Sequence, residues 1–140
     1  MIYEMRTYSF LPTDLPKYLK HAKDVGRPVR GNDYGVNCGY WISEFGRLNQ
    51  VWHLWRYESY AQREDLRAQL SQNSDWINKY VGVIKEWVQR QDIRIMNSHN
   101  SLAPPEGEGN IYEYRYYRLT VGSAGAWISN FKDALPHREK

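Results

Sequence analysis

Polar and apolar residues alternate with a period of two in four stretches of the chain, which predicts β-strands at residues 2–10, 36–44, 48–57 and 89–96. Between these stretches, apolar residues recur at helical spacing and predict helices over residues 13–25, 60–70 and 74–88. Gly26 and Pro28 indicate the end of the first helix. The element order is β-α-β-β-α-β, which is typical of a ferredoxin-like α+β fold.

The second and third predicted strands are joined in the stretch GYWISEFGRLNQVWHLWRY, from Gly39 to Tyr57. This stretch predicts a hairpin with its turn at Gly46. Alternation in the second arm places Val51, His53, Trp55 and Tyr57 on one face. The other face carries Gln50, Trp52, Leu54 and Arg56. Because tryptophan occurs on both faces, we expect helices to cover one face and a second sheet to cover the other.

A later segment repeats the beginning of the chain, because Tyr112-Glu113-x-Arg115-x-Tyr117 matches Tyr3-Glu4-x-Arg6-x-Tyr8. A strand at 111–119 and a helix at 125–135 are expected there, which adds a C-terminal β-α to the fold. The polar segment between the copies, with its prolines and glycines, predicts a linker. The expected organisation is a domain at 1–97, a linker at 98–110 and a partial second repeat at 111–140. The chain is then a shortened two-repeat protein or a fragment of one.

Composition indicates a globular protein with an ordinary core, because 41% of the 140 residues are hydrophobic and 15% are aromatic. The net charge of +3 comes from scattered Lys and Arg, so no nucleic-acid partner is expected. No apolar run approaches the roughly 18 residues of a membrane span, and no signal peptide pattern precedes the first strand. We therefore expect no membrane partner and a cytoplasmic protein, which the single Cys38 also fits.

The chain resembles the NIPSNAP family over essentially its whole length. The resemblance rests on five motifs: Tyr3-Glu4-x-Arg6-x-Tyr8, Gly39-Tyr40-Trp41, Glu44-x-Gly46-x-x-Asn49, His53-Leu54-Trp55-x-Tyr57, and Arg63 with Arg67. It implies a dimeric α+β barrel, in which two ferredoxin-like units face their sheets together. Because the second repeat is incomplete, we expect the barrel to form between chains, as a homodimer or a higher homo-oligomer.

His53 is the leading candidate for chemistry, as a base or a hydrogen-bonding group, because its strand would hold the imidazole in a partly desolvated barrel. The alternative is a core histidine satisfied by a nearby hydroxyl or carbonyl. With Tyr8 and Tyr57 as orienting hydroxyls, the predicted catalytic residues are His53, Tyr8 and Tyr57. The predicted ligand-binding residues are Trp41, Trp55, Arg6 and Tyr40.

Other polar residues favour structural roles. Glu4 and Arg6 share a strand face, and a buried acid and base so close together are expected to pair. Arg63 and Arg67 share a helix face, where they are expected to pair with carboxylates or to hold the strand below, and anion binding is the alternative. No G-x-G-x-x-G, P-loop or metal-binding histidine spacing occurs, so no cofactor and no metal are predicted.

Three functions fit these observations. The first is binding of a small hydrophobic molecule in an aromatic-lined barrel, or cofactor-independent catalysis of the monooxygenase, isomerase or cyclase kind found in the wider superfamily. The second is a non-catalytic interaction or scaffold role, as the resemblance implies for eukaryotic members. The third is RNA binding, because RNA-recognition modules share the element order, although residues 48–57 lack their basic-Gly-aromatic signature. Whether the chain is an enzyme stays open.

Overall fold

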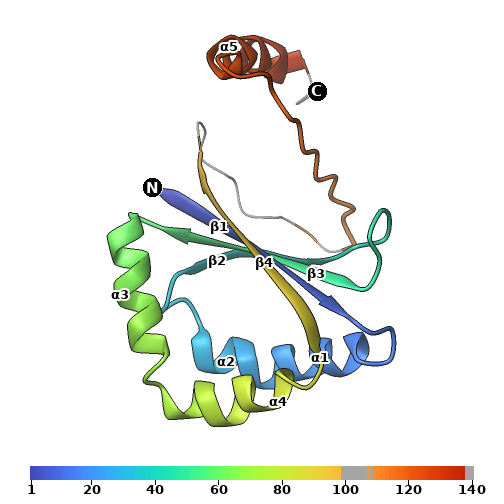
Figure 1. The fold of residues 1–140 in the computed structure, drawn as a ribbon, viewed down its shortest axis with the longest axis vertical. Coiled ribbons are helices and arrows are strands. Elements are labelled where there is room, and N and C mark those ends of the chain that lie inside the picture. Colours follow the sequence, from blue (N-terminus) through green and yellow to red (C-terminus); the bar gives the residue numbers. More distant parts are fainter. Residues whose placement is uncertain (99–106, 108, 138–140) are drawn as a thin grey trace. The chain divides into compact units, whose positions relative to one another are not determined.

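The computed structural model describes residues 1–98, 107 and 109–137 (Figure 1). The chain consists of two compact units, Met1–Glu106 and Gly107–Lys140. The first unit contains a four-stranded antiparallel sheet with strand order β2-β3-β1-β4. Its strands are β1 (Ile2–Phe10), β2 (Val36–Ile42), β3 (Gln50–Tyr57) and β4 (Val88–Asn97). This is the predicted ferredoxin-like order, with the two central strands buried and β4 at an edge.

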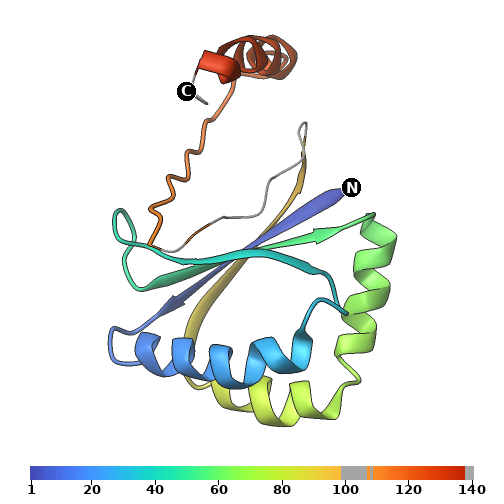
Figure 2. The same ribbon diagram turned by 180° about the vertical axis from the view of Figure 1, so that it is seen from behind.

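All helices of this unit lie on one face of the sheet (Figures 1 and 2). They are α1 (Leu15–His21), the π-helical η1 (Ala22–Gly26), α2 (Arg27–Arg30), α3 (Tyr60–Leu70), the π-helical η2 (Trp76–Val81) and α4 (Gly82–Ile84). The main core forms between these helices and the sheet, from Tyr8, Phe10, Tyr18, Ala22, Val51, Tyr80 and Ile84. Burial of these large side chains is the main source of stability in this unit.

The first helical segment continues past Gly26 and Pro28, so the predicted helix end was wrong. Pro28 stands in the first turn of α2, where its fixed φ and missing N–H are tolerated. The helix ends instead at Gly31, which adopts a φ of 51° that disfavours other residues. Gly26 has a packing role, because a Cβ at this position would lie 2.4 Å from the ring of Tyr80.

The other two helical segments begin at the predicted capping residues. The backbone N–H of Gln62 donates to Ser59 Oγ over 3.1 Å, and Glu58 N–H donates to Gln62 Oε1 over 2.8 Å. The backbone N–H of Trp76 donates to Asn73 Oδ1 over 3.0 Å. These bonds satisfy N–H groups that have no partner inside a helix, and they confirm both helix starts.

The opposite face of the sheet has no helix within residues 1–98 (Figure 2). Tyr3, Met5 and Leu54 are buried on this face. The side chains packed against them are those of Cys38, Trp41, Trp52 and Met96. Aromatic residues therefore occupy both faces of β3, as the sequence indicated.

The second unit contains α5 (Ala124–Ala134), followed by the 3₁₀ turn η3 (Leu135–His137). The helix confirms the prediction within one residue at each end. The strand expected at 111–119 is not formed, and residues 110–120 are neither helix nor strand. A strand requires a hydrogen-bonded neighbour, and the described part of this unit offers no second strand. The predicted linker falls mostly on residues 99–106 and 108, which lie outside the described residues.

A test of the core follows from the close approach of Gly26 and Tyr80. A methyl group at residue 26 would overlap the tyrosine ring, so Gly26→Ala should lower the free energy of unfolding by about 1–3 kcal/mol. Urea denaturation followed by tryptophan fluorescence measures this change. Gly125→Ala is the matched control, because Gly125 also lies in a helix but has no atom within 4 Å of an added Cβ. Equal unfolding midpoints for the two variants would contradict this packing.

Candidate functional site

Strand register brings most of the predicted site residues together on the helix-covered face. Arg6 of β1 and Tyr40 of β2 both lie opposite His53 of β3. Tyr8 follows Arg6 on the same face, and Trp55 follows His53. The alternation read from the sequence therefore gave the correct neighbours for His53.

The imidazole of His53 is enclosed by aromatic rings. It is 2% exposed, with the Tyr40 ring stacked on it at 4.7 Å and the Tyr8 ring edge-on at 4.8 Å between centroids. The indole Nε1–H of Trp55 donates a 2.7 Å hydrogen bond to His53 Nδ1. The ring is thus held in one orientation by three aromatic neighbours.

The bond from Trp55 fixes the tautomer of His53. Because Nδ1 accepts a hydrogen bond, the proton of the neutral imidazole must be on Nε2. Burial lowers the pKa of His53 well below 6.5, and the positive charges of Arg6, Arg30 and Arg67 lower it further. The imidazole is therefore neutral, and its Nε2–H is a buried donor without an acceptor among the residues that the structure describes.

An ion network runs beside the histidine. Arg6 donates from Nη1 to Glu4 Oε1 over 2.8 Å and from Nε to the Tyr8 hydroxyl over 3.0 Å. Arg63 of α3 donates to the second carboxylate oxygen of Glu4 and also pairs with Glu64. Burial raises the pKa of Glu4, but the charge of Arg6 and hydrogen bonds from both arginines outweigh this effect and hold the pKa below 4.5. The expected pairing of Glu4 and Arg6 is confirmed.

Arg30 is a site residue that the sequence reasoning missed. It is 3% exposed, and its guanidinium lies 3.3 Å from the centroid of the Trp55 ring. It donates 2.9 Å and 3.3 Å bonds to the Tyr57 hydroxyl and the Tyr34 carbonyl, while its Nε–H is buried without an acceptor in the described residues. The sequence contained one signal for Arg30, namely its position directly before Gly31, the glycine at which the helix ends.

Arg67 lies one helical turn after Arg63 and is partly buried. Within residues 1–98, neither a hydrogen bond nor a close ion pair holds its guanidinium. Burial lowers the pKa of Arg67, and the charge of Arg6 lowers it further. The expected pairing with a carboxylate is therefore seen for Arg63, while Arg67 makes no such close pair within residues 1–98.

Two sequence expectations about placement need correction. His53 does not face the helix-free side of the sheet, where facing sheets would enclose a barrel, because it lies on the side that packs against the helices. Trp41 pairs with Trp52 and lies on that helix-free side, where its ring covers Gly39. The sequence could not decide this, because both faces of β3 carry tryptophan and either could have met the helices.

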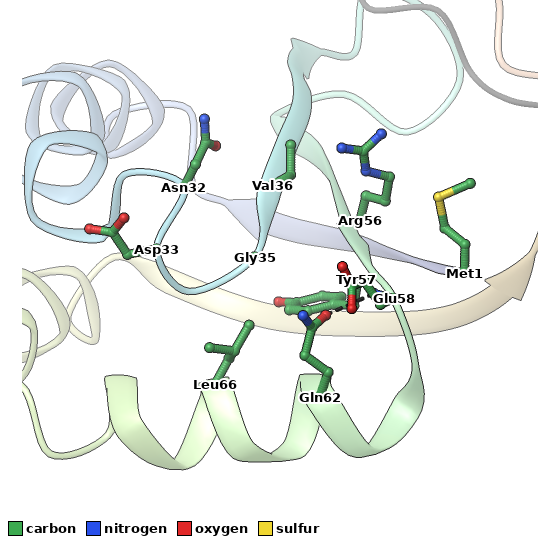
Figure 3. Close-up of a pocket in the computed structure, with 10 residues that line it drawn as sticks. All are labelled: Met1, Asn32, Asp33, Gly35, Val36, Arg56, Tyr57, Glu58, Gln62 and Leu66. Carbon is green, nitrogen blue, oxygen red and sulfur yellow. Dashed lines mark hydrogen bonds between the residues drawn. The ribbon is translucent and has the colours of Figure 1, made fainter.

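A depression of about 510 Å³ lies at the end of β3, next to α3. Figure 3 shows the residues that line it. It is lined by Met1, Asn32, Asp33, Gly35, Val36, Arg56, Tyr57, Glu58, Gln62 and Leu66. Tyr57 is the one predicted site residue in this lining, and its hydroxyl contacts Arg30. The depression therefore adjoins the site through Tyr57 but does not contain His53.

The described residues lack both a membrane-spanning helix and a cluster of metal-binding side chains. No helix in them has the length and apolar character needed to cross a bilayer. They also contain no group of three or more His, Cys, Asp and Glu residues that could hold a metal ion.

Comparison with known sequences identifies the NIPSNAP family. The NIPSNAP family model matches residues 3–101. Mouse Protein NipSnap homolog 3B is 27% identical over 136 residues, which cover 95% of this chain and 54% of that protein. Human Protein NipSnap homolog 3A is 27% identical over 138 residues, with coverages of 96% and 55%. The chain thus spans about half the length of these curated relatives.

Solved structures agree with this result. A NIPSNAP family protein from Agrobacterium tumefaciens has a TM-score of 0.65 and 31% identity, covering 69% of this chain and 86% of that one. A NIPSNAP-like domain protein from Burkholderia xenovorans has a TM-score of 0.67 and 28% identity, with coverages of 74% and 90%. A putative antibiotic biosynthesis monooxygenase from Nitrosomonas europaea, at a TM-score of 0.56, 8% identity and coverages of 71% and 100%, shares the fold alone.

The buried carboxylate of Glu4 allows a test of the ion network. Removing its charge leaves Arg6 and Arg63 without their shared partner, so Glu4→Gln should destabilise the fold by about 3–5 kcal/mol. Glu64→Gln, which removes the exposed partner of Arg63, is the matched control and should change stability by less than about 1 kcal/mol. The folded-state pKa of Glu4 is depressed, so its contribution is complete above pH 4.5 and is lost as the pH falls below that value. Chemical denaturation from pH 7 to pH 3 measures both effects, and identical pH profiles for wild type and Glu4→Gln would contradict the assignment.

The protonation state of His53 gives a second test. We expect the imidazole to remain neutral as the pH falls through 6.5, with its proton on Nε2, because burial and neighbouring arginines lower its pKa. Long-range ¹H–¹⁵N correlation spectra of histidine-labelled protein report the tautomer and charge directly. A proton on Nδ1 would show that the Trp55 bond does not exist in solution, and a titration midpoint near 6.5 would contradict the effect of burial and the arginines on the ring.

Proposed function

The chain belongs to the NIPSNAP family, and we propose that it binds a small molecule at His53, between the sheet and the helices. The observation that carries this proposal is the buried Nε2–H of His53, which has no acceptor among the described residues. A buried donor without a partner costs about 1–3 kcal/mol. A ligand oxygen that accepts this hydrogen bond would remove that cost.

The surroundings of His53 favour an aromatic, carbonyl-bearing ligand. The rings of Tyr8 and Tyr40 contact the imidazole, so a ligand that accepts from His53 would meet aromatic neighbours. The Tyr8 hydroxyl accepts from Arg6 and keeps its own proton to donate, as an orienting group would. Trp55 holds the imidazole and forms one wall.

If the ligand is also a substrate, the geometry favours polarisation over proton abstraction. The Nδ1 lone pair of His53 is occupied by Trp55, and a histidine with a strongly lowered pKa is a weak base. Its Nε2–H could instead stabilise negative charge on a carbonyl oxygen. This role suits a cofactor-independent isomerase, cyclase or monooxygenase, and in that case His53, Tyr8 and Tyr57 are the proposed catalytic residues.

We also propose that the chain acts as a homodimer. The helix-free face carries the half-buried Trp41 and Trp52, and an apolar aromatic surface of this kind favours pairing with a second copy. This arrangement would complete the α+β barrel that the fold implies. It is also compatible with the second function, a non-catalytic interaction protein, which would need the dimer and its surface but no ligand at His53.

Benzamide is a suitable probe, because it combines an aromatic ring with a neutral carbonyl. We expect it to bind the wild-type protein and to shift the His53 Nε2–H and Trp55 indole signals in ¹H–¹⁵N spectra. His53→Phe keeps a ring of similar size but removes the donor, so the affinity should fall about tenfold, the value of one hydrogen bond.

His21→Phe is the matched control, because His21 also stacks on a tyrosine, Tyr80, but lies outside the site. It should leave benzamide affinity unchanged. Thermal unfolding of each variant establishes that it is folded. Equal affinities of folded wild type and His53→Phe, or no binding to either, would rule out His53 as the ligand contact.

A further inference from the structure

The buried side of the sheet next to α3 has a marked excess of positive charge. Four guanidinium groups, those of Arg6, Arg30, Arg63 and Arg67, influence the same small region, and among the described residues Glu4 is the one buried carboxylate that pairs with any of them. Arg6 and Arg63 are satisfied by Glu4. The charges of Arg30 and Arg67 remain without a counter-charge of their own in the described residues.

An uncompensated buried charge is costly, and the structure shows how incompletely Arg30 is compensated. The Trp55 ring and two neutral oxygen acceptors stabilise its guanidinium, but no carboxylate of residues 1–98 contacts it. The Arg30 Nε–H is buried without an acceptor in the part of the chain described. A cation–π contact offsets only part of the cost of removing a charge from water.

Arg67 and His53 complete the pattern. The two arginines are close enough for the charge of Arg67 to lower the pKa of Arg30, and both lower the pKa of His53. Trp55 links His53 to Arg30, because it donates to His53 and its ring lies 3.3 Å from the guanidinium of Arg30. His53 Nε2 and Arg30 Nε are thus two buried N–H donors in one positively charged region, and neither has an acceptor in the described residues. An oxyanion offers what both lack, namely several acceptor lone pairs and a negative charge.

We propose that the ligand of this site is an aromatic carboxylate, with its carboxylate group held by Arg30 and Arg67 and one oxygen accepting from His53 Nε2–H. The inference rests on the function proposed above and names the chemical class of its ligand. Arg67, which is only partly buried, is the point at which the anion enters from solvent. The planar guanidinium fork matches the carboxylate, and the rings of Tyr8 and Tyr40 contact the aromatic body.

Benzoate and benzamide form a matched pair for the test, because they have nearly the same shape and differ in charge. We expect calorimetric titration to show that benzoate binds at least about tenfold more tightly than benzamide, the gain of a charge-assisted contact. Arg67→Gln should remove this preference, so that benzoate and benzamide bind with similar affinity. Arg47→Gln, which removes the same charge from the exposed hairpin turn, should keep the preference. Phenyl phosphate and inorganic phosphate are titrated in parallel.

The outcomes separate the two proposals. If benzamide binds and benzoate binds no more tightly, the carboxylate inference is overturned while binding at His53 stands. If phenyl phosphate or inorganic phosphate binds more tightly than benzoate, the site recognises phosphate and the carboxylate class is wrong. If Arg67→Gln retains the preference, Arg67 is not the anion contact and the proposal fails. If neither benzamide nor benzoate binds, both proposals fail.

Discussion

The site depends on the pairing of one buried carboxylate, Glu4, with two arginines. This carboxylate neutralises Arg6 on its own strand and Arg63 on α3, so it connects the sheet to the helix that borders the site. Both oxygens of Glu4 accept hydrogen bonds, one from Arg6 and one from Arg63, and within residues 1–98 neither Arg30 nor Arg67 hydrogen-bonds to this carboxylate. In these residues the buried positive charge of the arginines therefore exceeds what one shared carboxylate neutralises.

A second constraint acts through Trp55. Its indole N–H occupies one nitrogen of His53, and its ring face lies under the guanidinium of Arg30. One side chain therefore determines the tautomer of the histidine and holds a buried cation nearby. The two N–H groups without acceptors in the described residues, on His53 and Arg30, are therefore held in place by a rigid neighbour. Donors fixed in this way are pre-organised to bind an oxyanion more strongly than mobile water molecules would.

The sequence predicted the fold because its signals are local. Period-two alternation placed His53 with Trp55 and Tyr57, and capping at Ser59 and Asn73 located two helix starts. The site was harder to predict, because it depends on tertiary facts. Gly26 and Pro28 were interpreted as a helix end, so Arg30 was left outside every element, although a close contact with Tyr80 explains the glycine. Likewise, nothing in the alternation of β3 indicates which of its two aromatic faces the helices cover.

The internal repeat shows which features follow from local sequence and which depend on tertiary contacts. In the second copy, Arg115 pairs with Glu113 at 2.7 Å, as Arg6 pairs with Glu4 at 2.8 Å, although residues 111–119 form no strand. Residues two apart on an extended chain share a side, so this ion pair requires only local sequence. In the second copy both partners are exposed, whereas Glu4 and Arg6 are buried beneath α3. The motif therefore encodes a pair in either setting, and it becomes part of a charged site only where a helix with its own arginines covers the strand.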